Sequence, residues 1–307
     1  MAHAPLLFLT ALLDGVLLAN PFAAGGWWAW PVAAAAHAAV LVGALPRLPR
    51  SVAHGVHALG AVAAALLGAL WGRALTEPWG DPASAWPWLG WLIAPAALLL
   101  LLVRPAIARI WPVRLLPAAY RDSAGAAIAA GLWLWTLVAN VASDGSAAPL
   151  PYLPFVNPLD LGVGLALVAT LLWLRSSGRV EPWSLALAAA AAFVWLNAIL
   201  VRSFHHYAGM PYHVDAWLDS LAVQTGITLL WTAIALATMW LAAMRAIRLP
   251  WVAGAMLLGA AVVKLLVVDL SGGGAVRIVS FIGVGVLMLV IGYVAPLPAK
   301  EASHAAT

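Results

Sequence analysis

Three histidines, two carboxylates and an arginine gather in one stretch of the chain, residues 202–219, which reads RSFHHYAGMPYHVDAWLD. A histidine has an unperturbed pKa of about 6.5 and can act as a general acid or base at a wet surface. Imidazole and carboxylate groups also bind zinc and related ions. His205, His206, His213 and Asp215 show no recognisable ligand spacing, however, so no metal is expected. Packing of an interfacial loop is the leading alternative to any chemistry.

Charged residues near the C-terminal end form a second group of candidates. Lys264 and Asp269 lie in or near one long apolar run, and Arg277 follows across the short connection SGGGAV. If lipid surrounds that run, each charge needs a partner or a wet cavity. An ion pair that fixes helix packing and a functional cation explain Lys264 equally well.

Two further polar patterns have local structural explanations. Ser220, Gln224 and Thr228 recur every four residues, so they share one stripe of a helix. Hydrogen bonding to a neighbouring helix is the favoured reading of that stripe, and the lining of a ligand cavity is the alternative. In the segment NPLD, Asn157 and Asp160 are the residue types that helix starts prefer, so capping explains them without a ligand.

The composition places these residues in a membrane protein. Hydrophobic residues make up 65% of the 307 positions, charged residues 8%, and the mean hydropathy is +0.99, which is more apolar surface than a soluble domain can bury. The apolar runs are long and continuous, which favours spanning helices over a barrel. The chain has no cysteine, which excludes disulfides and thiolate chemistry. Its basic residues fall in short loops and form no nucleic-acid motif.

The sequence predicts an all-α polytopic bundle with about ten spans. We expect one transmembrane helical domain over residues 1–298 and a disordered cytoplasmic tail over 299–307. The predicted spans are 5–20, 27–45, 52–75, 86–103, 123–142, 159–175, 182–201, 216–244, 250–270 and 276–295.

The loops between these spans differ in charge. Lys and Arg are retained on the cytoplasmic side of a membrane. With ten spans, one side receives Arg47, Arg50, Arg104, Arg109, Arg114, Arg121, Arg175, Arg179, Arg245, Arg248 and Lys300. The asymmetry predicts a multi-pass protein of the inner (cytoplasmic) membrane with both termini in the cytoplasm.

This sidedness brings the candidate residues to the outward face, and we predict that they form one polar pocket there. The candidate catalytic residues are His205, His206 and Asp269. The candidate ligand-binding residues are Asn157, Asp160, Arg202, Gln224, Lys264 and Arg277. Such a mixture of charges suits an anionic or polyhydroxy ligand, for example an envelope glycan or a lipid headgroup. The sequence identifies no cofactor and no protein partner beyond the lipid bilayer, and it indicates no nucleic acid.

Four segments carry a resemblance to a known family. They are LPYLPFVNPLD at 150–160, WLNAILVRSFHHYAGMPY at 195–212, SLAVQTGITLLWTAIAL at 220–236, and the run from KLLVVDLSGGGAVRIVSF to YVAPLP at 264–298. Together they resemble the bacterial predicted membrane proteins called domain of unknown function 2339. The resemblance covers 150–298, and family members are typically longer, so the chain resembles a short member or their C-terminal part. It implies membrane location and brings no activity, substrate or catalytic residue.

Three function classes are open at this point, and whether the chain is an enzyme is one of the questions. An enzyme would use a histidine or aspartate for acid–base or transfer chemistry on an envelope glycan or a lipid-linked anionic substrate. A transporter or channel for a small polar solute would need polar residues in the inner halves of the spans, and these are few. A membrane scaffold would use its buried ion pairs only to set helix register.

Overall fold

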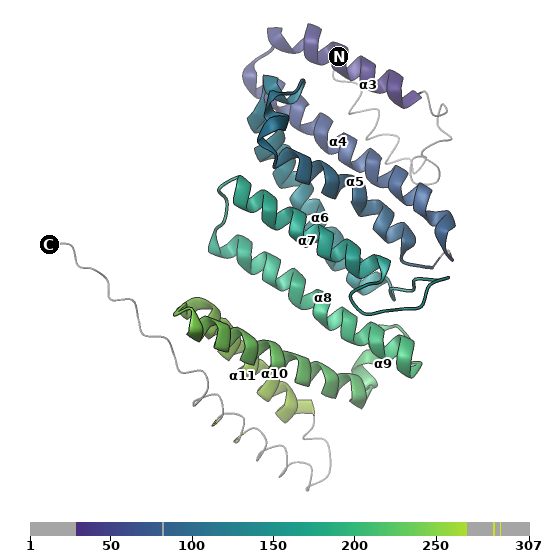
Figure 1. The fold of residues 1–307 in the computed structure, drawn as a ribbon, viewed down its shortest axis with the longest axis vertical. Coiled ribbons are helices and arrows are strands. Elements are labelled where there is room, and N and C mark those ends of the chain that lie inside the picture. The colour runs from purple at the N-terminus through teal and green to yellow at the C-terminus, as the bar shows by residue number, and fades with distance from the viewer. Residues whose placement is uncertain (1–28, 82, 269–284, 286–288, 290–307) are drawn as a thin grey trace, which may run out of the picture. The chain divides into compact units, whose positions relative to one another are not determined.

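The chain is helical throughout the part that the structure describes. In this computed structural model, residues 29–81, 83–268, 285 and 289 are described, and they contain helices and no strand (Figure 1). The α-helices are α3 (Ala29–Gly43), α4 (Arg50–Thr76), α5 (Trp86–Leu102), α6 (Gly125–Ala142), α7 (Pro158–Ser176), α8 (Pro182–Ala208), α9 (Val214–Asp219), α10 (Leu221–Met244) and α11 (Arg248–Val268). A π-helical turn, η5 (Ala119–Ala124), precedes α6, and four short 3-10 turns lie in the connections.

Six of these helical segments are long and apolar enough to cross a bilayer: Arg50–Trp79, Ala119–Ala142, Pro158–Ser176, Pro182–Ala208, Leu221–Met244 and Arg248–Leu265. α3 and α5 are apolar but shorter. The predicted fold class, a polytopic bundle of transmembrane helices, is thereby confirmed. Eight of the ten predicted spans correspond to helices, while 5–20 and, apart from residues 285 and 289, 276–295 lie outside the described residues. The total number of spans and the side of each terminus stay predictions.

Two predicted boundaries were wrong. α8 does not end at residue 201 but continues to Ala208, because no glycine or proline interrupts RSFHHYA, and Gly209 ends the helix in the left-handed conformation with φ 69°. The predicted span 216–244 is divided, because Ser220 has extended backbone and caps α10, accepting a hydrogen bond from the Val223 amide. His205 and His206 therefore stand on a helix and not in a loop.

The described chain divides into two compact units, residues 1–209 and 210–307. The first contains α3 to α8 and the second contains α9 to α11. Each unit is described by itself. The single domain predicted over 1–298 stays a prediction, and the predicted tail 299–307 lies outside the described residues.

Small residues bring the helices of the first unit close together. α4 and α5 approach so closely that a Cβ added to Gly72 would lie 2.1 Å from the carbonyl oxygen of Gly90. Helices in lipid associate through such close contacts, because lipid offers no hydrophobic driving force between them. Leu92, Leu99 and Trp173 fill the core where α5, α6 and α7 meet.

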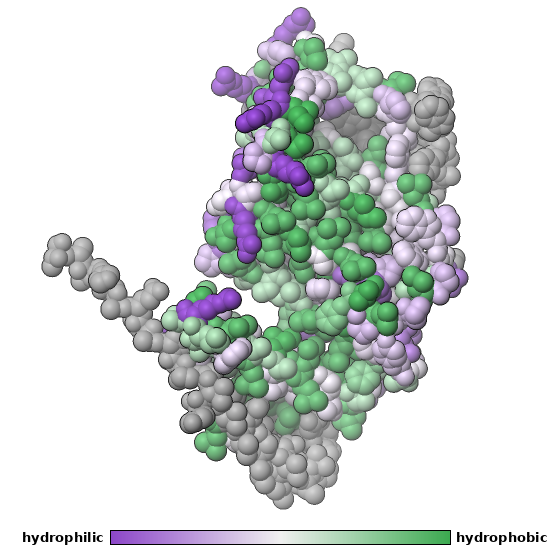
Figure 2. Space-filling model, in the orientation of Figure 1, coloured by the Kyte–Doolittle hydropathy of each residue, from purple (hydrophilic) through white to green (hydrophobic). Residues whose placement is uncertain are grey.

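The helices of the first unit alternate in direction, so their ends collect at two levels, which we call the arginine end and the histidine end. The arginine end holds the start of α4, the end of α5, η5, and the connection between α7 and α8, with Arg47, Arg50, Arg104, Arg109, Arg114, Arg121, Arg175 and Arg179. The histidine end holds the connections 77–85 and 143–157 and the end of α8. In Figure 2 the most hydrophilic side chains lie along the left-hand edge, and the helix faces between the two levels are mostly apolar.

Hydrogen bonds between side chains join α4 to η5 near the arginine end. His57 is buried and its Nδ1 is hydrogen-bonded to Tyr120 Oη at 2.7 Å. One turn earlier, His54 Nε2 is bonded to Ser123 Oγ, also at 2.7 Å.

In the second unit, α10 and α11 pack along their length. Gly254 of α11 faces α10 so closely that an added Cβ would lie 2.7 Å from Met239 Cγ. The short helix α9 begins at His213, whose Nδ1 accepts a hydrogen bond from the Ala216 amide and so caps it.

Candidate functional site

Arg202 of α8 is the centre of a buried polar network at the histidine end. None of its side chain is exposed. Its Nη1 donates to Asp160 Oδ1 at 2.7 Å, its Nη2 donates to Asn140 Oδ1 at 2.6 Å, and its Nε donates to the Ser143 carbonyl at 3.3 Å. Charge-assisted bonds of this kind replace the hydration that a buried guanidinium loses. The arginine therefore connects α8 to α6, to α7 and to the loop 143–157.

Asp160 is equally buried and accepts bonds on both carboxylate oxygens. Oδ1 accepts from Trp195 Nε1 at 2.8 Å as well as from Arg202, and Oδ2 accepts from the Phe155 amide at 3.1 Å and from Asn157 Nδ2. Asn157 Oδ1 accepts in turn from the Asp160 amide at 3.0 Å, which caps α7. The helix cap predicted for NPLD is present, and Asp160 is in addition the ionic partner of Arg202.

The loop 143–157 lies directly over Arg202. Gly145 has φ 73°, and a Cβ there would lie 2.9 Å from Arg202 Cδ, so both conformation and space require glycine at this position. The Ser146 amide donates to Asp144 Oδ1 at 2.9 Å, and the Ser146 carbonyl accepts from the Ala85 amide at 2.8 Å. These bonds fix the Asp144 carboxylate at the end of α8.

Asp144, His205 and His206 are partly exposed and lie close together in this region. His205 Nε2 lies 3.5 Å from Asp144 Oδ2, and both side chains are 28% exposed. His206 Nε2 donates to the Asp144 carbonyl oxygen at 2.9 Å, which leaves its Nδ1 as an acceptor. One ligand atom from each residue lies within 4.8 Å of the other two. The arrangement can carry out acid–base chemistry, because a carboxylate orients an imidazole, the side chain that most often serves as a general acid or base.

The same three residues could hold a metal ion with an open position, since two imidazoles and a carboxylate are a common ligand set for zinc. Zinc bonds of about 2.0–2.2 Å would draw them closer together than they are. His213 and Asp215, the other candidates from the sequence, are not in this group, because His213 caps α9. The expectation of no metal stays a prediction.

Tyr152 is buried and supports His206 from the protein interior. Its ring stacks on His206 with centroids 4.1 Å apart, and its carbonyl oxygen accepts from Tyr207 Oη at 2.9 Å. Burial is the largest cause that raises the pKa of the Tyr152 phenol, and the nearby Asp160 carboxylate adds to it. The hydroxyl is therefore protonated throughout the physiological range.

Two of the other predicted site residues meet in the second unit. Lys264 Nζ of α11 donates to Thr228 Oγ1 and to the Gln224 carbonyl of α10, both at 2.9 Å. Gln224 Nε2 donates to the Trp217 carbonyl at 2.9 Å, which joins α10 to α9. Within the predicted stripe, Thr228 faces α11, the Gln224 side chain bonds α9, and Ser220 caps α10.

Seven of the nine predicted site residues are therefore found in two groups. Asn157, Asp160, Arg202, His205 and His206 lie together in the first unit, and Gln224 and Lys264 lie together in the second. Asp269 and Arg277 lie outside the described residues. One pocket containing all nine stays a prediction.

Sequence reasoning missed Asp144 and Asn140 as members of the site. Asp144 gives no motif signal, because the surrounding segment ASDG looks like an ordinary turn. Both residues stand about sixty positions before their partners, and no spacing rule covers such a separation. The one available signal was that Asp144 is a carboxylate on the predicted outward side, where it could form an ion pair with His205.

Comparisons with known proteins agree with the membrane architecture. A search of curated proteins and a search of solved structures both find no match. The model of a family described as predicted membrane protein (DUF2339) matches residues 1–298. The match includes the first half of the chain, so the resemblance confined to 150–298 was too narrow. The chain belongs to the DUF2339 family of predicted membrane proteins.

Proposed function

We propose that the histidine end is an outward-facing site that binds a polar ligand of the cell envelope, a glycan or a lipid headgroup. The observation that carries the proposal is the convergence of Asp144, His205 and His206, whose ligand atoms lie within 4.8 Å of one another beside the ring of Tyr152. Their accessibility contrasts with the complete burial of Arg202 and Asp160. The buried pair positions the site, and the three partly exposed residues contact the ligand.

The exposed groups favour a hydroxyl-rich ligand over a purely anionic one. The guanidinium that could neutralise an anion is already bonded to Asp160 and Asn140 and is sealed from solvent. What remains is one carboxylate and two imidazoles, which accept from and donate to hydroxyl groups. The Tyr152 ring is buried and stacks on His206, so it holds that imidazole in place and does not itself contact the ligand. If the protein is an enzyme, Asp144 orients His205 as the general base for a ligand hydroxyl.

The experiment compares headgroups in nanodiscs. Native mass spectrometry would measure retention of a monoglucosyl diacylglycerol, phosphatidylglycerol and phosphatidylcholine by the wild-type protein and by Asp144→Asn and His205→Ala variants. We expect the glycolipid to be retained preferentially, and each variant to weaken its binding by about tenfold, the effect of one hydrogen bond to a charged group.

His54→Ala is the matched control, because it removes an imidazole at the arginine end, where His54 is bonded to Ser123. This variant should bind the glycolipid like the wild type. Equal retention of all three lipids by the wild type and by every variant would remove the basis for a headgroup site. A parallel titration with a soluble glucose disaccharide distinguishes a glycan ligand from a lipid ligand.

A scaffold is the second candidate function, and one observation favours it: Arg202 and Asp160 are fully buried and bonded within the chain. Such a pair can specify how α6, α7 and α8 pack without any ligand. In that case Asp144→Asn and His205→Ala would leave both binding and cellular phenotype unchanged. Replacing Arg202 and Asp160 together with apolar residues would then also preserve function, provided that the helices still assemble.

A further inference from the structure

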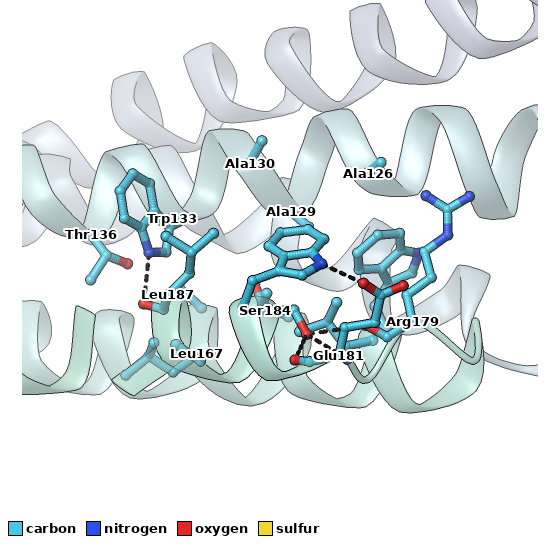
Figure 3. A pocket seen from close by; sticks show the side chains of 16 residues that line it. Ala126, Ala129, Ala130, Trp133, Thr136, Leu167, Arg179, Glu181, Ser184 and Leu187 are labelled. Atoms are coloured by element: carbon cyan, nitrogen blue, oxygen red, sulfur yellow. Dashed lines mark hydrogen bonds between the residues drawn. The ribbon is translucent and has the colours of Figure 1, made fainter. Parts of the chain in front are cut away.

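A cavity of about 380 Å³ lies between α6, α7 and α8 and opens near the arginine end (Figure 3). Its wall consists mainly of alanine, leucine and tryptophan side chains, among them Ala126, Ala130, Trp133 and Leu187. The volume lies within the range of roughly 300–1,000 Å³ that is usual for small-molecule sites. It is separate from the Asp144 site, which lies at the opposite ends of the same helices.

Three polar side chains on the wall are bonded to the protein itself. Trp133 Nε1 donates to the Leu187 carbonyl at 3.0 Å, and Trp173 Nε1 donates to the Arg121 carbonyl at 2.8 Å. Thr136 Oγ1 donates to the Leu132 carbonyl at 2.9 Å. These three groups have no donor left for a ligand. Apart from the Thr170 hydroxyl, the rest of the interior is mostly alanine, leucine and tryptophan, so it suits an alkyl chain.

The mouth of the cavity has a different character. Arg179 and Glu181 lie there, in the connection between α7 and α8. Glu181 accepts from Trp183 Nε1 at 2.6 Å and also caps α8, so its charge is used within the protein. Arg179 has one ionic contact, to Asp122 at 3.8 Å, and 46% of its side chain is exposed. A guanidinium carries five donors, so most of them remain for a ligand.

We propose that this cavity holds an acyl chain of an anionic phospholipid, with the lipid phosphate at Arg179. Three observations agree on that occupant: the apolar interior, the partly exposed guanidinium at its mouth, and the position of the mouth at the level where the arginines of the first unit collect. Basic pockets between transmembrane helices on the cytoplasmic side are a known form of lipid recognition. The proposal does not depend on the site at the histidine end.

The test uses the full chain in detergent and in nanodiscs, with native mass spectrometry to measure binding of phosphatidylglycerol and phosphatidylcholine. Ala130→Phe fills the cavity from α6, and Ala188→Leu fills it from α8. Ala127→Phe is the matched control, because Ala127 is exposed on the same helix and does not line the cavity. Arg179→Gln removes the charge at the mouth and leaves the cavity open.

We expect the wild type and Ala127→Phe to bind one phosphatidylglycerol about tenfold more tightly than phosphatidylcholine, as one charge-assisted hydrogen bond implies. Both cavity-filling variants should lose that lipid, and Arg179→Gln should keep a lipid without preferring either headgroup. Two cavity-filling variants are used so that a fold defect in one does not decide the result.

Three outcomes contradict the proposal. The first is unchanged lipid binding in whichever cavity-filling variant folds. The second is that millimolar inorganic phosphate displaces phosphatidylglycerol completely, which would mean that Arg179 binds a free anion and that the cavity contributes nothing. The third is a cross-linked dimer that Ala130→Phe abolishes and Ala127→Phe does not, which would make a second copy of the chain the occupant.

Discussion

Replacing Asp160 by asparagine keeps the shape of the side chain and removes the negative charge beside Arg202. In the wild type the carboxylate accepts from Arg202, Trp195, Phe155 and Asn157, and neither member of the ion pair is exposed. Removing one partner of a buried ion pair leaves the other charge uncompensated, which costs about 3–5 kcal/mol. We expect Asp160→Asn to lower the free energy of unfolding by that amount.

An exposed ion pair in the same unit provides the control. Arg179 and Asp122 are 3.8 Å apart and are 46% and 40% exposed, so their contact should contribute no more than about 1 kcal/mol. The assay is reversible unfolding of the purified protein in mixed micelles, comparing Asp160→Asn with Asp122→Asn. A cycle with Arg202→Met should show a coupling of about 0.5–3 kcal/mol, as contacting residues do.

The double replacement Asp160→Leu and Arg202→Met separates charge from packing. Two apolar residues of similar size should restore most of the stability that either single change removes, because no uncompensated charge remains. If Asp160→Asn costs no more than Asp122→Asn, the guanidinium is hydrated in the folded protein and the buried network does not exist as described.

The remaining predictions concern sidedness, ionisation and packing. The chain has no cysteine, so a single cysteine can be introduced and labelled from outside spheroplasts. Leu150 and Ile110 are exposed in loops at opposite ends of the first unit. Leu150→Cys should react with an impermeant maleimide and Ile110→Cys should not, and the reverse result would invert the topology. The raised pKa of Tyr152 means that ionisation of its hydroxyl destabilises the folded state. The free energy of unfolding should therefore decline as the pH rises above about 10. Tyr152→Phe should reduce that alkaline loss in a thermal melt. Gly72→Ala should lower the free energy of unfolding by about 1–3 kcal/mol, because its Cβ would meet the Gly90 carbonyl. Gly131→Ala has open space and should stabilise helix α6 by about 0.5–1 kcal/mol. Similar melting temperatures for the two variants would show that α4 and α5 do not pack closely.

Much of the fold could be predicted from the sequence because hydropathy is a local property. Eight apolar runs within the described residues became helices, and NPLD caps α7 as its residue types indicate. The end of α8 was harder to predict, since His205 and His206 are polar enough to suggest a loop. Their helical conformation depends on the left-handed Gly209, which ends the helix one residue after Ala208.

The candidate site was only partly predictable because its contacts join distant positions. Arg202 is bonded to Asp160 and Asn140, which precede it by 42 and 62 residues. Single-sequence patterns have periods of two to four residues and cannot pair such positions. The adjacent histidines illustrate the same limit: on a regular helix they diverge, yet a loop that returns to the end of α8 places Asp144 close to both.

The order of the buried network along the chain has a consequence for biogenesis. Asn140 and Asp160 are synthesised before Arg202, so α6 and α7 have left the ribosome when the arginine of α8 emerges. The hydrogen-bond partners of the Arg202 guanidinium, the most hydrophilic side chain of α8, are therefore already synthesised when α8 enters the membrane. If the translocation machinery releases α8 laterally next to α6 and α7, the guanidinium can bond its carboxylate at once. Insertion of α8 would then be the event that fixes the packing of these three helices.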